Sequence, residues 1–323
     1  MFADGLLGIG ELAERAGVSV KTVRFYSDRG LLPEAGRSAG GHRRYGPDAV
    51  ERLRLIRALR ALDVAVPEIG RVLGRLPEDD GGLDGDVLDG GVLEDVVAGQ
   101  LREVGTQLAA LRWREAALRL VRECPPGERA ERLRLVGAVS APPSTAPMAR
   151  FWRRWLPPRL PARLVSAILE EAVPQPPDEP RPDQVLAFAR LHAFVSGTCT
   201  PGPGGKRWQP EAHRPDKSFR PAVLYDGLRE AYTLAAVEMR ALRAPHDGEA
   251  LDCFVAAYAG SRGARDTPDL RRVLSGQLAA DPRIDRYWAL VAEVSRPASG
   301  PPEPTPGVIH DWLLAALDEQ IAC

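Results

Sequence analysis

Several features are scarce in this 323-residue sequence, and each shortage excludes a class of protein. The cysteines number four, lie far apart and form no Cys-x-x-Cys pair: Cys124, Cys199, Cys253 and Cys323. An iron–sulfur centre is therefore excluded, and free thiols in a reducing compartment are expected. No apolar run approaches the roughly 20 residues that cross a membrane. Leu6-Leu7 is too short an apolar pair for a signal peptide, so we expect a cytoplasmic protein.

Motifs for catalysis are also scarce. No phosphate-binding glycine motif and no zinc motif is present, and the one nucleophile–base–acid combination close in sequence is Cys199, His213 and Asp216. These residues lie in the glycine- and proline-rich segment 197–221, which is a poor support for a nucleophile that must stay within hydrogen-bond reach of its base. The sequence therefore predicts no enzyme, no cofactor and no metal. A segment of this length is either a lid over a pocket or disordered, and both remain open.

Charge is distributed unevenly along the chain. The net charge is −1, but residues 1–77 contain 13 basic and 9 acidic residues, a net of +4, whereas residues 78–95 contain eight acidic residues and no basic one. A phosphate backbone responds to the local field and not to the whole-chain charge. The first 77 residues are therefore suited to binding a nucleic acid.

Two short helices are predicted at the start of this basic region. Ile9, Leu12, Ala13 and Ala16 have helical spacing, and Gly17 ends the helix. Ser19 is placed to cap a second helix, in which Val20 and Val23 face inward while Lys21, Thr22 and Arg24 face outward. Two such helices form a helix-turn-helix, whose second helix enters the major groove of DNA.

A hairpin and two further helices are predicted to follow. After the turn at residues 36–41, residues 42–45 form a return strand with Arg43 and Tyr45 on one face and His42 and Arg44 on the other. A third helix begins at Pro47, and residues 67–73 form a fourth. In the third helix, Leu53, Ile56, Leu59 and Leu62 make the apolar face, and Arg52, Arg54, Arg57 and Arg60 carry charge.

This order of elements resembles the DNA-binding domain of the MerR family of transcription regulators. The resemblance covers 68 residues and rests on these stretches: Ile9-Gly-Glu-Leu-Ala, Gly17-Val-Ser, Thr22-Val-Arg-Phe-Tyr26, Gly30-Leu-Leu-Pro33, Gly41-His-Arg-Arg-Tyr45 and residues 53–62. His42 departs from the family's usual tyrosine, and Asp63 from its usual glycine. We predict a winged helix-turn-helix domain at residues 1–77, with these DNA-binding residues: Ser19, Lys21, Thr22, Arg24, Tyr26, Arg37, Arg43, Arg44, Tyr45, Arg57 and Arg60.

The next two segments differ sharply in composition. Residues 78–91 are acidic and glycine-rich, which predicts a flexible linker. Residues 92–124 have a heptad pattern, with Val97, Val104, Leu111 and Leu118 in one row and Leu101 and Leu108 in the other. The pattern predicts a coiled-coil helix that needs a partner, although docking on the chain's own C-terminal domain is an alternative. Metal-sensing members of the family have a metal-binding cysteine at the place of Cys124, but no second thiol lies nearby, so metal sensing is not expected.

The remainder is predicted to be helical, which makes the whole chain mainly α. Residues 125–147 are a connector, and residues 148–323 form an α-helical effector-binding or sensor domain. Aromatic residues with a few acids, such as Asp226, Glu230 or Glu238, are suited to a planar or cationic compound. The effector-site candidates are Trp152, Trp155, Trp208, Tyr225, Tyr232 and Trp288, of which Trp152 and Trp155 are expected to be the most exposed.

The resemblance implies how such a protein works. MerR regulators bind double-stranded promoter DNA as homodimers, through antiparallel pairing of the long helix, and distort the spacer between the −35 and −10 elements so that RNA polymerase engages both. An unknown small molecule would favour one geometry of the dimer. Two alternatives remain open: a drug-binding protein that acts by sequestration and whose DNA-binding domain is autoregulatory, and a constitutive regulator whose C-terminal domain binds other proteins.

Overall fold

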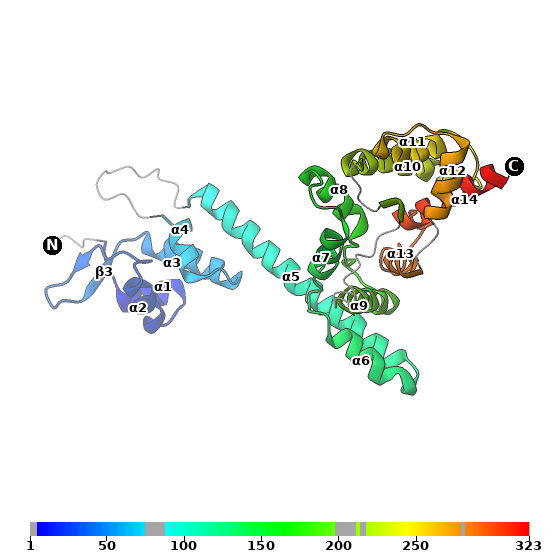
Figure 1. Cartoon of the computed structure of the whole chain (residues 1–323). Coiled ribbons are helices and arrows are strands. Elements are labelled where there is room, and N and C mark those ends of the chain that lie inside the picture. Colours follow the sequence, from blue (N-terminus) through cyan, green and yellow to red (C-terminus); the bar gives the residue numbers. More distant parts are fainter. Residues whose placement is uncertain (1–4, 75–87, 198–210, 214–217, 279–281, 323) are drawn as a thin grey trace. The chain divides into compact units, whose positions relative to one another are not determined.

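The chain folds mainly into α-helices. The computed structural model describes residues 5–74, 88–197, 211–213, 218–278 and 282–322 (Figure 1). Fourteen α-helices and one three-stranded sheet lie in these residues. None of the described helices combines the length and the apolar character that a membrane span requires. The chain divides into two compact units, Met1–Gln107 and Leu108–Cys323.

The first unit contains the predicted helix-turn-helix and its hairpin. Its helices are α1 (Ile9–Ala16), α2 (Val20–Asp28), α3 (Ala49–Ala61) and α4 (Val66–Val72), and its strands are β1 (Leu7–Gly8), β2 (Gly36–Arg37) and β3 (Arg43–Tyr45). The strand order is β1-β3-β2, and both outer strands run antiparallel to β3, with Leu7 opposite Tyr45 and Arg37 opposite Arg43. The hairpin of β2 and β3 is the predicted wing. Strand β1 was not predicted, because two residues are too few to show a period of two.

Local signals determine the two helix ends in the turn. Gly17 adopts a φ of 64°, in the left-handed region that glycine enters without steric cost, and ends α1. Ser19 Oγ then accepts a hydrogen bond from the Thr22 amide at 3.1 Å, which confirms the predicted cap of α2. Val23 is fully buried as predicted, but the inward position predicted for Val20 is wrong: this residue begins the helix and is 40% exposed.

The third helix has one arginine on its buried side, where we predicted only apolar residues. Arg52 is 7% exposed and donates to the carbonyl oxygens of Leu31 at 2.7 Å, Leu73 at 3.2 Å and Gly74 at 3.1 Å. The guanidinium thus satisfies three carbonyls that no helix or strand satisfies, which offsets its desolvation. Leu62, predicted to face inward, lies just beyond the last turn and is exposed.

Asp63, which stands at a position where the resemblance expects glycine, has a φ of 59°. This left-handed conformation is more favourable for glycine than for a residue with a Cβ atom. The backbone therefore accounts for the family's preference at this position, and aspartate is among the residues that tolerate it best.

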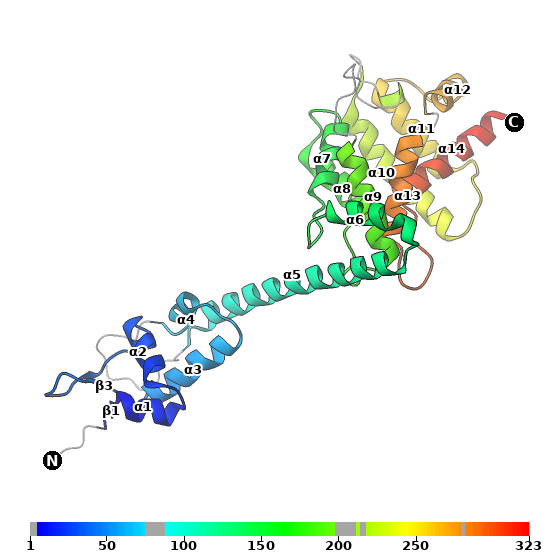
Figure 2. The ribbon, with the colours of Figure 1, turned by 90° about the horizontal axis from the view of Figure 1, so that it is seen from below.

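Helix α5 (Gly90–Glu123) is a single long helix in both ribbon views (Figure 1, Figure 2). It begins inside the segment that we predicted to be a linker, because Asp89 Oδ1 accepts from the Val92 amide at 3.0 Å and caps it. The linker residues 78–87 lie outside the described residues. Val96 is buried in the core of the first unit, whereas Trp113 and Leu120 are buried in a core of the second.

Besides the end of α5, nine helices lie in the described residues of the second unit. They are α6 (Arg129–Gly137), α7 (Ala146–Trp155), α8 (Ala162–Ala172), α9 (Pro182–Gly197), α10 (Pro221–Arg240), α11 (Glu249–Arg262), α12 (Pro268–Gln277), α13 (Pro282–Val294) and α14 (Pro306–Ala322). Two short 3₁₀ helices, η1 (Pro126–Glu128) and η2 (Glu211–His213), accompany them. Helix α7 was not predicted, because the proline-rich stretch before it indicated a boundary. The segment predicted to be a connector contains α6, which packs against α9.

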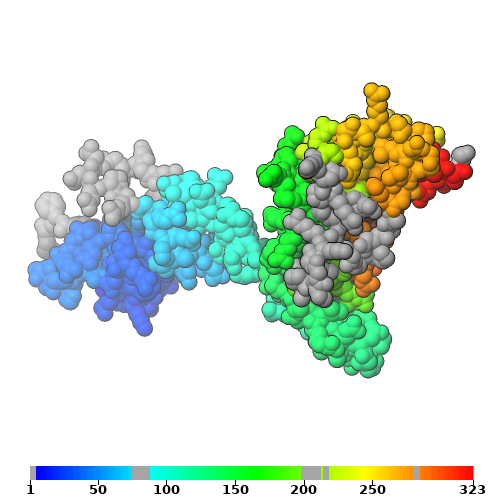
Figure 3. All heavy atoms as spheres, in the orientation of Figure 1, coloured from blue at the N-terminus to red at the C-terminus, as the bar shows by residue number. Residues whose placement is uncertain are grey.

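Two hydrophobic cores hold this unit together, and its green, yellow and red segments form one packed body in the space-filling view (Figure 3). Helix α10 packs most extensively on α11, where a Cβ atom added to Gly227 would lie 2.6 Å from that of Ala257. Only glycine permits this close approach of the two backbones. The other core surrounds Phe188 of α9 and Tyr287 of α13, both fully buried.

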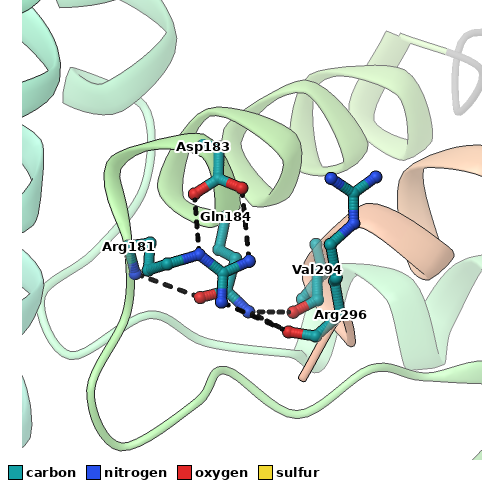
Figure 4. A network of polar contacts seen from close by, with 5 residues as sticks. All are labelled: Arg181, Asp183, Gln184, Val294 and Arg296. Carbon is teal, nitrogen blue, oxygen red and sulfur yellow. Dashed lines mark hydrogen bonds and ion pairs between the residues drawn. The ribbon is translucent and has the colours of Figure 1, made fainter. Parts of the chain in front are cut away.

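A buried amide joins the start of α9 to the end of α13 (Figure 4). Gln184 Nε2 donates to the carbonyl oxygens of Val294 at 2.9 Å and Arg296 at 3.0 Å, and its Oε1 accepts from the Arg181 amide at 3.0 Å. The Arg181 guanidinium is held in turn by Asp183 at 3.2 Å. One side chain thus satisfies backbone groups of two segments more than 100 residues apart.

Replacing Gln184 with leucine is expected to lower the free energy of unfolding by about 1–3 kcal/mol, because the backbone groups it pairs lose their partner inside the protein. All six tryptophans of the chain lie in the second unit, so intrinsic fluorescence reports its unfolding in urea. Asp183→Asn is the control; it weakens only an exposed ion pair and should cost less than about 1 kcal/mol. Equal midpoints for the leucine variant and the wild type would show that the amide is not stabilising.

Candidate nucleic-acid interface and ligand cavity

The outer face of α2 carries the predicted DNA-reading side chains. Ser19 and Thr22 are joined by a hydrogen bond of 2.8 Å between their hydroxyl oxygens, at the N-terminal end of the helix. Lys21 and Arg24 are exposed, and within the described part of the chain neither forms an ion pair. Their charges are therefore available to phosphates and base edges.

The arginines of the wing are engaged with acids. Arg43 pairs with Asp28 of α2 at 2.6 Å and with Glu34 at 2.8 Å, and Arg37 pairs with the other oxygen of Glu34 at 3.1 Å. The hydrogen bond that Arg43 donates to the Asp28 carboxylate raises the pKa of Arg43 above its ordinary value. Arg43 thus joins β3 to the end of α2, and its charge is largely balanced. The geometry favours a positioning role for Arg43, while Arg44, on the other face of β3, is half-buried.

Two residues predicted to contact DNA lie in the protein core. Tyr45 is fully buried, and Tyr26 is 8% exposed. A side chain without exposed surface does not reach DNA, so the prediction of a direct contact by Tyr45 is wrong for this structure. The alternation along β3 that places Arg43 near α2 also directs Tyr45 into the core. Tyr26 exposes little more than an edge of its ring and packs at 5.2 Å, edge to face, on Phe25.

The two α3 arginines that we predicted to contact DNA also bind backbone. Arg57 Nη1 donates to the Ala16 carbonyl at the end of α1 at 2.9 Å, and Arg60 Nη1 donates to the Val64 carbonyl at 2.8 Å. Both residues are otherwise exposed and keep further N–H groups at the surface. Their contact with DNA stays a prediction.

Sequence reasoning did not single out Phe25 and Arg29. Phe25 is 42% exposed on α2, and the Arg29 guanidinium lies 4.2 Å from the centre of its ring. The four-residue spacing of an aromatic residue and an arginine on one helix was the signal that predicts such a pair.

Alanine at Arg24 is expected to weaken binding to duplex DNA about 3- to 10-fold and to lower the slope of log K against log salt by about 1, because one phosphate contact is lost. Arg54→Ala is the matched control, since Arg54 is exposed on α3 and pairs with Glu51. Fluorescence anisotropy across a salt series measures both quantities. An unchanged affinity and slope for Arg24→Ala would remove α2 from the contact surface.

A cavity of about 150 Å³ lies in the second unit. Of the six residues predicted for an effector site, five line it: Trp152, Trp155, Tyr225, Tyr232 and Trp288. The sixth, Trp208, lies outside the described residues. The expectation that Trp152 is exposed is wrong: it is 4% exposed, and its Nε1 donates to the Tyr287 hydroxyl at 2.7 Å. The Tyr287 hydroxyl donates in turn to the Ala172 carbonyl at 2.6 Å.

The acids of the cavity are not those suggested by the sequence. Asp226, Glu230 and Glu238 are absent from its described lining, whereas residues from α8, α13 and α14 contribute carboxylates: Glu171, Asp285 and Asp311. Arg229 also lines the cavity and lies 3.7 Å from Glu171. No sequence signal connects these three acids, because they come from three different helices and Glu171 lies more than 100 residues before the other two.

Two histidines of the cavity, the buried His213 and the half-buried His310, contact tyrosine hydroxyls. His213 lies 3.3 Å from the Tyr225 hydroxyl and 3.0 Å from that of Tyr258, and His310 lies 2.9 Å from the Tyr232 hydroxyl. Burial lowers the pKa of His213 to about 3 and that of His310 to about 4. Both rings are therefore neutral at pH 7. Cys199 and Asp216, considered with His213 as a catalytic set, lie outside the described residues.

Among the described residues, no group of three or more His, Cys, Asp or Glu side chains is arranged to hold a metal ion. Cys124 is buried, and its Sγ lies 3.2 Å from the Val121 carbonyl oxygen. A thiol in this position is a hydrogen-bonded part of the helix end.

Comparison with known proteins matches the first unit to a single family. Residues 7–76 match the model of the MerR HTH family regulatory protein. The chain is 39% identical over 72 residues to the mercuric resistance operon regulatory protein of Bacillus cereus, covering 22% of this chain and 54% of that protein. It is 40% identical over 74 residues to the HTH-type transcriptional activator SoxR homolog of Chromobacterium violaceum, covering 23% and 49%. Nodulation protein NolA of Bradyrhizobium elkanii is 46% identical over 65 residues, covering 20% and 30%. The chain thus spans about half the length, or less, of these relatives, and the family match ends before α5.

Proposed function

Residues 7–76 are a MerR-type helix-turn-helix domain. From this premise, we propose that the chain is a dimeric transcription regulator that changes the level of transcription when it binds a small molecule. The observation that carries the DNA-binding part is the outer face of α2. Its first turn is capped by Ser19, and Lys21 and Arg24 extend from it unpaired among the described residues. The names of two relatives, a regulatory protein and a transcriptional activator, agree with this role.

Dimer formation is supported by α5. The apolar stripe of α5 comprises the six residues of the heptad pattern, Val97, Leu101, Val104, Leu108, Leu111 and Leu118, and they are between 38% and 68% exposed in the single chain. The opposite face, with Trp113, Ala116 and Leu120, is buried in the second unit. A helix that is already packed on one side and still exposes a heptad seam is suited to pairing with a second copy. We propose an antiparallel pair of α5 helices, which gives a two-fold dimer for a pseudo-palindromic site.

A continuous core connects the cavity to α5 within the second unit. Trp113 of α5 packs on Phe188 at 5.4 Å between ring centres, and both belong to the core that contains Trp152. Trp152 lines the cavity and packs edge to face on Tyr287 at 5.4 Å, and Phe151 stacks on the Tyr287 ring at 5.6 Å. A ligand that repacks Trp152 would therefore alter the support of α5. An effector needs a differential affinity of a few kcal/mol between two dimer geometries to change the output at a promoter and the engagement of RNA polymerase.

The cavity also favours a second candidate, a drug-binding protein that acts by sequestration. Deleting residues 1–77 separates the two. If cells that express residues 78–323 are as resistant to the ligand as cells that express the full chain, sequestration is the main function. If resistance to the ligand disappears while residues 78–323 still bind the ligand in vitro, regulation is the main function.

Footprinting of the full chain on the DNA upstream of its own coding sequence tests the proposal. We expect protection of a pseudo-palindromic site within a promoter spacer, with two half-sites about one helical turn apart. A chain that stays monomeric and gives no protection at low salt would contradict both the dimer and the regulator.

A further inference from the structure

We infer that the cavity of the second unit takes a flat aromatic cation, with one or two fused rings between its aromatic walls and the positive charge at its acidic mouth. This inference rests on the proposed function, since it names the class of ligand for the proposed effector site. It goes beyond that proposal because the presence of a cavity says nothing about the charge of its occupant.

The walls of the cavity are aromatic rings from three different helices. Trp152 and Trp155 of α7 lie 5.1 Å apart, and Trp288 of α13 lies 5.5 Å from Trp152, measured between ring centres. Tyr225 and Tyr232 of α10 complete the aromatic lining. Gly307 leaves room for the Trp288 ring, because an added Cβ atom would lie 2.2 Å from Trp288 Cγ. Such walls favour stacking of a planar ring, and their electron-rich faces favour a cation.

Charge in the lining is predominantly negative. Glu171, Asp285 and Asp311 contribute three carboxylates from three helices, and the described lining contains one arginine, Arg229, which lies beside Glu171. Because His213 and His310 are kept neutral by burial, they do not offset these carboxylates. The rings lie deepest, with Trp152 and Tyr225 buried, whereas Glu171 and Asp311 are exposed. The polarity therefore runs from apolar at the base to anionic at the entrance.

The carboxylates also repel one another. Burial and the charge of Asp285 both raise the pKa of Asp311 above its ordinary value. A positive group at the entrance would relieve this repulsion, and an anionic ligand would add to it. A cavity of about 150 Å³ admits a single benzene ring, so the second ring of a fused pair would have to extend into the mouth.

Three probes of one shape and different charge test the inference: N-methylquinolinium (cationic), 1-methylnaphthalene (neutral) and 1-naphthoate (anionic). Binding to the full-length protein is followed by quenching of its tryptophans. We expect the cation to bind at least about 10-fold more tightly than either of the others, and Asp311→Asn to weaken the cation about 5-fold while leaving the neutral probe unchanged. Glu319→Gln is the matched control, because Glu319 is exposed on the same helix and does not line the cavity.

The remaining outcomes overturn the inference in distinguishable ways. If 1-methylnaphthalene or 1-naphthoate binds as tightly as the cation and Trp155→Ala abolishes binding, the cavity is a ligand site, but not one for cations. If no probe binds, or if Asp311→Asn and Glu319→Gln have equal effects on the cation, the assignment of ligand class is wrong. The footprint on upstream DNA is independent of these probes, and its absence would contradict the proposed function alone.

Discussion

A glutamate in place of Leu108 is expected to raise the dissociation constant of the proposed α5 dimer by at least about 100-fold. Leu108 lies in the middle of the apolar stripe of α5 and is 45% exposed in the single chain. Burial of a leucine contributes about 1.5–3 kcal/mol, and a two-fold interface contains each position twice. The substitution also places two carboxylates in a desolvated seam. Sedimentation velocity over a concentration series measures the constant.

Thr106→Glu is the control for this experiment. Thr106 is exposed on α5 two residues from Leu108 and outside the stripe, so the same charge on another face should leave the dimer intact. DNA affinity provides a second readout: Leu108→Glu should lose most binding to a two-half-site duplex and little binding to a single half-site. If both variants remain dimeric at micromolar concentration, the chain pairs through a different surface, or α5 pairs with another segment.

Acid is expected to destabilise the second unit strongly below pH 6. Burial, together with the smaller effects of the nearby His310 and Arg262, lowers the pKa of His213 to about 3, whereas the unfolded chain protonates near the ordinary value of 6.5. The folded pKa lies below the unfolded one, so the unfolded state binds the additional proton. Stability is therefore complete above about pH 6.5 and falls as the pH decreases toward 3, by about 1.4 kcal/mol per pH unit for one histidine.

His310 acts in the same direction, since burial lowers its pKa to about 4, so the two rings together give a slope of up to about 2.7 kcal/mol per pH unit. Urea unfolding followed by tryptophan fluorescence at pH 7, 6 and 5 measures the slope. The hydroxyls of Tyr225 and Tyr258, which face His213, remain protonated throughout this range because burial raises the pKa of both.

His213→Gln keeps a polar side chain between the two tyrosines and removes the titrating ring. Between pH 6 and 5, its free energy of unfolding should therefore change less steeply with pH than that of the wild type, by about 1.4 kcal/mol per pH unit, which corresponds to one proton. The control is His246→Gln, at an exposed position of the same unit, which should retain the wild-type slope. Parallel slopes in all three proteins would mean that His213 is protonated in the folded state as readily as in the unfolded one.

The two halves of the chain differ in how far they were predictable. In the first unit and along α5, short-range signals located most elements: Gly17 ends α1, Ser19 caps α2, and the heptad rows of α5 follow from spacing alone. Such signals act within one or two turns of backbone, which is the range that a local pattern describes. The errors there, at Val20, Arg52 and Tyr45, concern which side of an element faces the core.

For the cavity, composition predicted the kind of residue but not the constellation. Aromatic side chains were correctly singled out, since five of the six line the cavity or lie in its wall. The acids were misassigned, because Asp226 and Glu230 lie on the same helix as two of these aromatics and were nearer in sequence. Helix α7 was missed altogether, and with it the burial of Trp152.

The sequence alone therefore determined the helix-turn-helix, its wing and the heptad pattern, because turns, caps and periodicities depend on residues that are close in the chain. Three features required the tertiary structure. They are the pairing of Arg43 with Asp28, the three carbonyls bound by Arg52, and the position of Glu171, Asp285 and Asp311 in the lining of the same aromatic cavity. These contacts join residues that are distant in sequence, and their free energy depends on burial and on the position of a partner, which no local pattern specifies.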